Sequence, residues 1–171
     1  MNSSSFALDR LQAAQGARHR KFVVVVDDSP ECALAIRFAA GRAAHTIGGR
    51  VMLFYVLPRV DFMHWMAVED VMRDEAWTQA EALMTHLAEC IYQHVGLYSE
   101  VQIREGDAAE QLLEVLRRDP DVFALILGAS AEGKSPGPLV DYFSGEIAGS
   151  LPCPVVIVPG SLSQERIDAM V

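Results

Sequence analysis

Five consecutive apolar residues, Phe22-Val-Val-Val-Val26, constrain the fold of this chain more than any other segment. A run of this kind, with no alternating polar residues, is typical of a strand that is buried on both faces, as in a parallel sheet. Ser29 and Pro30 follow after two aspartates, and they suit the N-cap and the first position of a helix. The chain is therefore predicted to enter its core through a β–α unit.

The same alternation repeats along the rest of the chain. Strands are predicted at residues 22–26, 51–57, 100–104, 122–127 and 155–158, and helices at 30–45, 69–95, 107–119 and 141–151. Asp107 and Asp141 are predicted to cap the last two of these helices, and the long helix is expected to bury a stripe that begins at Met72. The pattern predicts an α/β fold with a mostly parallel sheet and helices on both faces.

A chain of 171 residues suits one domain. We expect a leader over residues 1–20 that is partly disordered, an α/β domain over 21–159 and a C-terminal tail over 160–171. An apolar cluster interrupts the connection before the long helix, and it comprises Phe62, Met63, Trp65 and Met66. This cluster is expected to pack over the mouth of a crevice or under the long helix, and the alternative is a lid or a partner surface.

Charge and composition exclude several classes of function. The 14 Lys and Arg residues against 23 Asp and Glu residues give a net charge of −9, which argues against binding to nucleic acid or to an anionic membrane. No apolar run approaches the ~20 residues of a membrane span, and residues 1–21 do not have the pattern of a secretory signal. Three widely spaced cysteines form no disulfide framework. A cytoplasmic location is the resulting expectation.

Most catalytic motifs are absent as well. The first predicted strand ends in Asp27-Asp28-Ser29, so no glycine-rich dinucleotide fingerprint follows it, and the five histidines show no zinc-ligand spacing. Residues 128–135 match the P-loop spacing, but the prolines at 136 and 138 are not expected to continue the helix that a P-loop needs. No base–nucleophile pair supports an enzyme, so catalysis is not the favoured function.

The loops that follow the strands carry the remaining signal. In a doubly wound sheet, ligands bind at the carboxyl ends of the strands, where the strand order reverses. Four segments together resemble the universal stress protein family: Val24–Glu31, Gly106–Glu110, Leu125–Ser130 and Leu151–Val156. The resemblance runs from about Phe22 to Pro159. It implies a single-domain, Rossmann-like sheet of five strands in the order 3-2-1-4-5, and a homodimer formed through the strand at Val155–Val158.

Some members of this family bind ATP beside the first and fourth strands. The resemblance implies an acidic residue near the ribose at Asp27, in the loop that contains Ser29, and backbone that meets adenine at Val56. The glycine-rich phosphate motif is matched only at Gly128, because Ala131 and Asp141 replace its other glycines. Its hydroxyl residue falls at Tyr142, with Ser144 close by, while Lys134 and Ser135 lie in the same loop.

These differences predict a degenerate adenine-nucleotide crevice. The carboxylate of Asp141, acting as an N-cap, would occupy the helix N–H groups that a phosphate needs and would repel a triphosphate. We expect a dimeric, cytoplasmic regulatory protein of the stress response that binds ATP weakly or not at all. The alternative is a protein that binds ATP or AMP through residues 128–135 and hydrolyses ATP slowly. Mg²⁺ is expected only with a bound phosphate, and a regulatory protein partner is a further expectation.

Overall fold

Five parallel strands form a single sheet in the order β3-β2-β1-β4-β5, as predicted. The computed structural model describes residues 19–59, 66–133, 135–145 and 147–171. Its strands are β1 (Arg20–Val25), β2 (Gly49–Leu57), β3 (Ser99–Glu105), β4 (Val122–Ala129) and β5 (Val155–Pro159). The order reverses between β1 and β4, so the carboxyl ends of these two neighbours are the place where a ligand site is expected.

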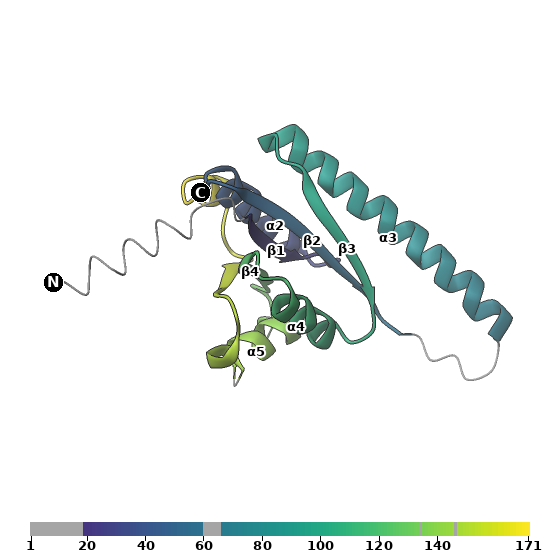
Figure 1. The fold of residues 1–171 in the computed structure, drawn as a ribbon. Helices are drawn as coiled ribbons and strands as arrows, with labels where there is room; N and C mark the ends of the chain where they lie inside the picture. Colours follow the sequence, from purple (N-terminus) through teal and green to yellow (C-terminus); the bar gives the residue numbers. More distant parts are fainter. Residues whose placement is uncertain (1–18, 60–65, 134, 146) are drawn as a thin grey trace.

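Helices cover both faces of this sheet (Figure 1). On one face lie α2 (Pro30–Ala44) and α3 (Met66–Val95), and α6 (Gln164–Asp168) packs against α2. On the other face lie α4 (Ala108–Arg118) and α5 (Pro138–Ser144), the latter followed by a short 3₁₀ turn at Ala148–Ser150.

The run of valines in β1 supplies both halves of the core. Val24 is completely buried in the cluster beneath α2 and α3, whereas the adjacent Val23 is completely buried in the cluster beneath α4 and α5. Successive side chains of a strand point to opposite faces, so a strand covered on both sides needs apolar residues at every position. This requirement explains why β1 lacks the alternation of a half-exposed strand.

The segment after β5 is part of the core. The side chain of Ile167 in α6 is completely buried against the cluster beneath α2. Outside that contact, the guanidinium of Arg37 donates two hydrogen bonds of 2.6 Å to the two carboxylate oxygens of Asp168. Paired bonds of this geometry fix α6 in orientation as well as in position.

The first turns of α3 project past the carboxyl ends of the strands (Figure 1). The apolar stripe predicted for this helix is therefore wrong at its beginning, where Met72 is 49% exposed, while Ala80 and Ile91 further along are buried. Among the described elements, no strand lies under this part of the helix to cover Met72. Arg73 contacts Glu105 at the end of β3 and connects this part of the helix to the sheet. Phe62, Met63 and Trp65, of the predicted apolar cluster, lie outside the described residues.

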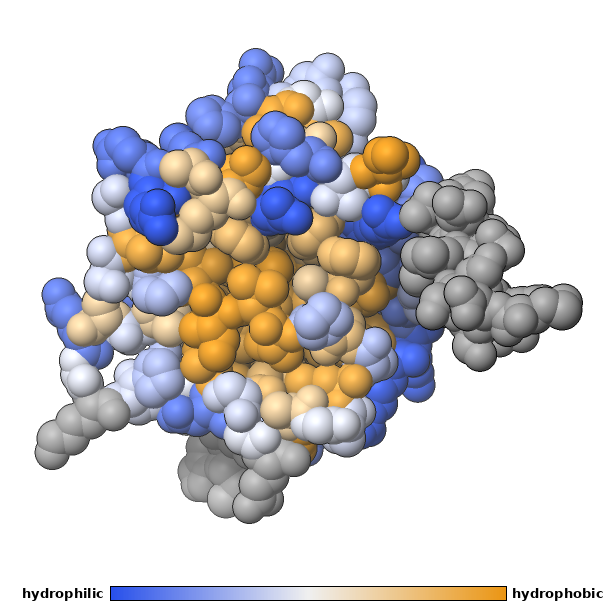
Figure 2. All heavy atoms as spheres, turned by 90° about the vertical axis from the view of Figure 1, so that its left-hand side faces the viewer, coloured by the Kyte–Doolittle hydropathy of each residue, from blue (hydrophilic) through white to orange (hydrophobic). Residues whose placement is uncertain are grey.

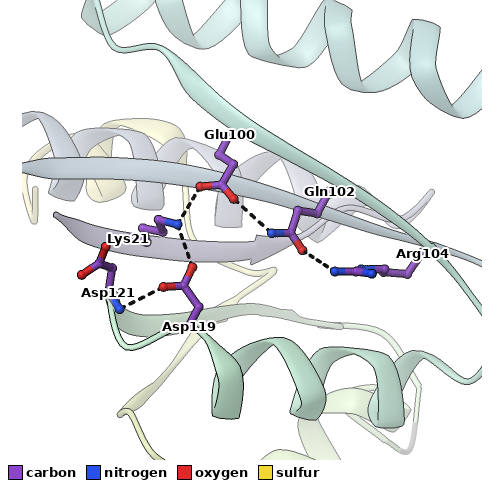
Figure 3. A network of polar contacts seen from close by, with 6 residues as sticks. All are labelled: Lys21, Glu100, Gln102, Arg104, Asp119 and Asp121. Carbon is purple, nitrogen blue, oxygen red and sulfur yellow. Dashed lines mark hydrogen bonds and ion pairs between the residues drawn. The ribbon is translucent and has the colours of Figure 1, made fainter.

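A polar network joins the opposite end of the sheet (Figure 3). The ammonium of Lys21 in β1 lies 2.7 Å from a carboxylate oxygen of Asp119 and 2.8 Å from one of Glu100 in β3. Burial alone would raise the pKa of Asp119, but hydrogen bonds from Lys21 and from the backbone N–H of Asp121 outweigh it and lower that pKa. Burial acts to lower the pKa of Lys21, and the two carboxylates overcome this effect and raise it. One cation thus holds two carboxylates, which connects β1, β3 and the turn after α4.

Candidate functional site

A cleft of about 570 Å³ opens at the carboxyl ends of β1 and β4, where the strand order reverses. Its walls come from the ends of β1, β2 and β4, from the first turns of α2, α4 and α5, and from the loop before α5. Apolar side chains form much of the lining, namely Val25, Val26, Val56, Leu127, Leu139 and Val140. A cleft of this size and lining is typical of a site for a small organic molecule.

Asp27 stands at the mouth of this cleft, directly after β1. Its Oδ1 accepts a hydrogen bond of 2.9 Å from the backbone N–H of Ser29 and one of 2.5 Å from the Ser29 hydroxyl. Ser29 occupies the N-cap position of α2, as predicted, but its hydroxyl serves Asp27 and not the helix. The two bonds orient the Asp27 carboxylate at the cleft, where it can accept hydrogen bonds from a ligand.

Glu31, one residue into α2, crosses the end of β4. A Cβ atom placed on Gly128 would lie 2.9 Å from the Cγ atom of Glu31 and 3.0 Å from its backbone oxygen. A Cβ on Gly160, after β5, would lie 3.2 Å from the Cβ of Glu31. Glycine at these two positions thus leaves the space that Glu31 occupies. The family resemblance places Gly128 in the phosphate motif, and in the structure the backbone and the Cγ atom of Glu31 lie beside it.

The start of α5 differs from the prediction. The helix begins at Pro138 after Gly137, whose φ of 121° is accessible to glycine, and it ends at Ser144. Asp141 is therefore not its N-cap but lies one turn inside the helix, because proline suits the first helical position and starts the helix earlier. The Asp141 carboxylate accepts a hydrogen bond of 2.5 Å from the Ser135 hydroxyl, which in turn accepts one of 3.2 Å from the backbone N–H of Gly137.

These contacts change the explanation for the degenerate phosphate side. Asp141 does not occupy the N–H groups at the start of α5, but it accepts a hydrogen bond from the hydroxyl that the P-loop spacing would place on the Mg²⁺ ion of a bound nucleotide. The loop is closed further by Ser130, whose backbone N–H donates to Pro136 and whose hydroxyl donates to the carbonyl of Glu132. The hydroxyls of Ser130 and Ser135 are thus engaged within this part of the chain.

The structure brings together only some of the predicted site residues. Those that line the cleft are Asp27, Ser29, Val56, Gly128 and Tyr142. Ala131, Ser135 and Ser144 are not among the lining residues, and the Ser144 hydroxyl donates to the carbonyl of Val140 within α5. Lys134 lies outside the described residues.

Among the lining residues that were not predicted, three carry ionisable side chains, namely Glu31, Cys32 and Asp107. Asp107 accepts a hydrogen bond of 2.9 Å from the backbone N–H of Glu110, so the capping role that the sequence indicated also places its carboxylate in the cleft. Cys32 is buried, and burial raises the pKa of its thiol, so it contributes a neutral, weakly polar wall. Their position in the first turns of α2 and α4 was the available signal.

The described lining of the cleft is acidic. Asp27, Glu31 and Asp107 contribute three carboxylates, and the lining holds no lysine or arginine within the part of the chain that the structure describes. Among all the residues that the structure describes, no group of three or more His, Cys, Asp or Glu side chains is arranged to hold a metal ion. None of the described helices is long and apolar enough to cross a membrane.

The fold is that of a doubly wound α/β protein, and its cleft lies at the strand reversal, where such proteins bind ligands. The family model described as "Universal stress protein family" matches residues 18–159. The chain belongs to the universal stress protein family.

Comparison with solved structures agrees with this membership. Universal stress protein UspA from Lactobacillus plantarum is 17% identical, with a TM-score of 0.69, over 84% of this chain and 99% of that one. A universal stress protein in complex with cAMP is 17% identical, with a TM-score of 0.57, over 85% and 100% of the two chains. A family protein from Arabidopsis thaliana with AMP bound is 18% identical, with a TM-score of 0.51, over 82% and 91%. A comparison with curated proteins finds no match.

Proposed function

We propose that this universal stress protein is a regulatory module whose cleft binds adenosine or AMP in preference to ATP. The observation that carries the proposal is the position of Glu31, which lies beside Gly128 and lines the cleft on the side where the family resemblance places the phosphates. The apolar walls that include Val56 and Leu127 support binding of the base, and Asp27 supports binding of the ribose hydroxyls.

Charge sets the expected order of affinity. Two unit charges 4 Å apart interact by about 1 kcal/mol in water and about 4 kcal/mol near a protein surface. Each added phosphate brings more negative charge toward Glu31 and Asp107, so affinity should fall from adenosine to AMP to ATP. The cAMP and AMP named for the two similar structures also carry less charge than ATP, which supports the same order.

Calorimetry with adenosine, AMP and ATP, all in the absence of Mg²⁺, on the purified protein tests this proposal. Glu31→Gln removes the charge, keeps the shape of the side chain and should improve ATP binding more than adenosine binding, by about tenfold or more for each 1.4 kcal/mol of repulsion relieved. Glu114→Gln on the exposed surface of α4 is the matched control and should leave all three affinities unchanged.

The alternative function predicts the opposite order. If the segment at residues 128–135 serves as a phosphate loop, ATP should bind more tightly than AMP, and Lys134→Ala should weaken ATP alone. That result, or a Glu31→Gln variant with unchanged ATP affinity, would overturn the proposal. Incubation of the protein with Mg²⁺–ATP, followed by chromatography of the nucleotides, measures the slow hydrolysis that the alternative includes.

We further propose that the protein forms a homodimer through β5. This strand is the outer strand of the sheet on the side opposite β3, and the side chain of Ile157 in it is 39% exposed. Figure 2 shows a broad apolar area on the side of the molecule where the yellow segments of Figure 1 lie, which include β5. An apolar edge strand favours pairing with another chain, and a second copy related by a two-fold axis would cover the β5 edges of both chains at once.

A further inference from the structure

On the exposed surface of α3, at residues that do not line the cleft, two side chains of types that can bind metal ions face each other. The Nε2 atom of His86 lies 3.6 Å from the Sγ atom of Cys90. Residues four positions apart are neighbours on a helix surface, which explains the contact. Both side chains are exposed, and Glu89, Gln93 and His94 line the same shallow hollow.

The distance between these two atoms matches the geometry of a metal site. Zinc binds histidine nitrogen at about 2.0–2.1 Å and cysteine sulfur at about 2.3 Å, so the tetrahedral angle places the two ligand atoms about 3.5–3.6 Å apart. The observed 3.6 Å leaves His86 and Cys90 able to accept one ion with little rearrangement of the helix. A backbone already held in a long helix also reduces the entropy cost of bringing the ligands together.

We propose that His86 and Cys90 form a two-ligand site for a soft divalent cation of the zinc type. Thiolate and imidazole ligands select Zn²⁺ and Cd²⁺ over Mg²⁺ and Ca²⁺, which prefer oxygen. Zinc bonds to the Cys90 sulfur and the His86 Nε2 atom, and the thiol proton passes to the buffer. Because no group of three ligands is present among the described residues, water completes the tetrahedron.

The residues of this site do not line the cleft, so the site can be tested independently of the proposed function. Zn²⁺ is titrated into the reduced, full-length protein, with binding measured by calorimetry and Mg²⁺ as the unreactive cation. Protection of Cys90 from alkylation by iodoacetamide is the second readout, because Cys90 is the exposed cysteine while Cys32 is buried and Cys153 is half-buried.

Zn²⁺ should bind one ion per chain and slow the alkylation of Cys90, and Mg²⁺ should do neither. His86→Ala and Cys90→Ser should each weaken Zn²⁺ binding more than tenfold, because loss of a ligand should exceed the roughly 10–100-fold effect of losing an outer-shell partner. His94→Ala is the matched control: it removes a histidine from the same hollow, one turn beyond Cys90, and should preserve binding. All three substitutions lie on the helix surface, and circular dichroism checks that the helix persists.

The assignment is overturned if Cys90→Ser binds Zn²⁺ as the wild-type protein does, or if Zn²⁺ leaves the alkylation rate unchanged. It is also overturned if His94→Ala loses as much affinity as His86→Ala, because the pair would then not be the one that the structure brings together. A stoichiometry of one ion per two chains, abolished by Cys90→Ser and by His86→Ala, would support the pair with a second copy in place of water.

Discussion

Replacement of Lys21 by methionine tests the network at the end of the sheet opposite the cleft. The change keeps an apolar stem of similar length and removes the cation between Asp119 and Glu100. One oxygen of each carboxylate contacts the same ammonium, at 2.7 Å for Asp119 and 2.8 Å for Glu100, so the two oxygens lie no more than about 5.5 Å apart. At that separation two like charges repel by about 1 kcal/mol in water and about 3 kcal/mol at an effective dielectric constant of 20. Lys21 is only 15% exposed and Asp119 19%, which limits relief by solvent.

We therefore expect Lys21→Met to lower the free energy of unfolding by about 2–4 kcal/mol at pH 7, toward the range for a buried pair that loses one partner. The loss should depend on pH. In the wild-type protein the lowered pKa of Asp119 stabilises the fold above the ordinary carboxyl pKa of about 4, and this contribution disappears as the pH falls through the lowered value. In the variant the unbalanced carboxylates repel, so acid relieves the strain, and the difference between the two proteins should shrink below pH 4.

Urea unfolding of both proteins at pH 7 and pH 3.5 measures this difference. Glu114→Gln, which removes the exposed contact with Arg118, is the control and should change stability by less than about 0.5 kcal/mol. Adding Asp119→Asn to Lys21→Met removes one of the two like charges and should restore part of the loss. A variant within 0.5 kcal/mol of wild type at pH 7, or an equal loss at both pH values, would refute the reasoning.

Two further substitutions test the packing and the proposed dimer. Gly49→Ala would place a Cβ 2.1 Å from the backbone oxygen of Ala43, so we expect a loss of stability of about 1–3 kcal/mol or more in thermal or urea unfolding, whereas Gly149→Ala, which meets nothing within 4 Å, should be tolerated. Ile157→Asp should convert the dimer to monomers in light scattering, and Ile47→Asp, at a side chain that is 91% exposed, should not. A wild-type mass of one chain would contradict the dimer.

The inner strands β1, β2 and β4 could be predicted from the sequence because the requirement for burial on both faces leaves continuous apolar runs. The continuous valines of β1 predicted its two-sided packing, and the capping role of Asp107 is confirmed by its bond to Glu110. The start of α5 was predicted wrongly because two helix-start signals compete in this segment. Asp141 suits an N-cap, but Pro138 suits the first helical position and lies three residues earlier.

The cleft was less predictable than the sheet, for a different physical reason. Asp27 and Gly128 could be assigned to one crevice because the strand order places their strands side by side. The role of Glu31 could not be predicted, because it depends on the distance between α2 and the end of β4. The conformational preferences of nearby residues do not determine that distance. The bond between Ser135 and Asp141 is likewise set by how the loop before α5 folds back, and no spacing rule in the sequence encodes it.

The packing of α6 on α2 has a consequence for how the chain folds as it is synthesised. Arg37 and Asp168 are 131 positions apart, and every strand of the sheet except β1 lies between them in the sequence. A ribosome releases α2 long before it has made Ile167, so the alanine-rich face of α2 remains partly uncovered during most of translation. At ordinary elongation speeds of about 5–20 residues per second, that interval lasts roughly 7–26 seconds. During this time the nascent chain exposes apolar surface to chaperones and to other nascent chains.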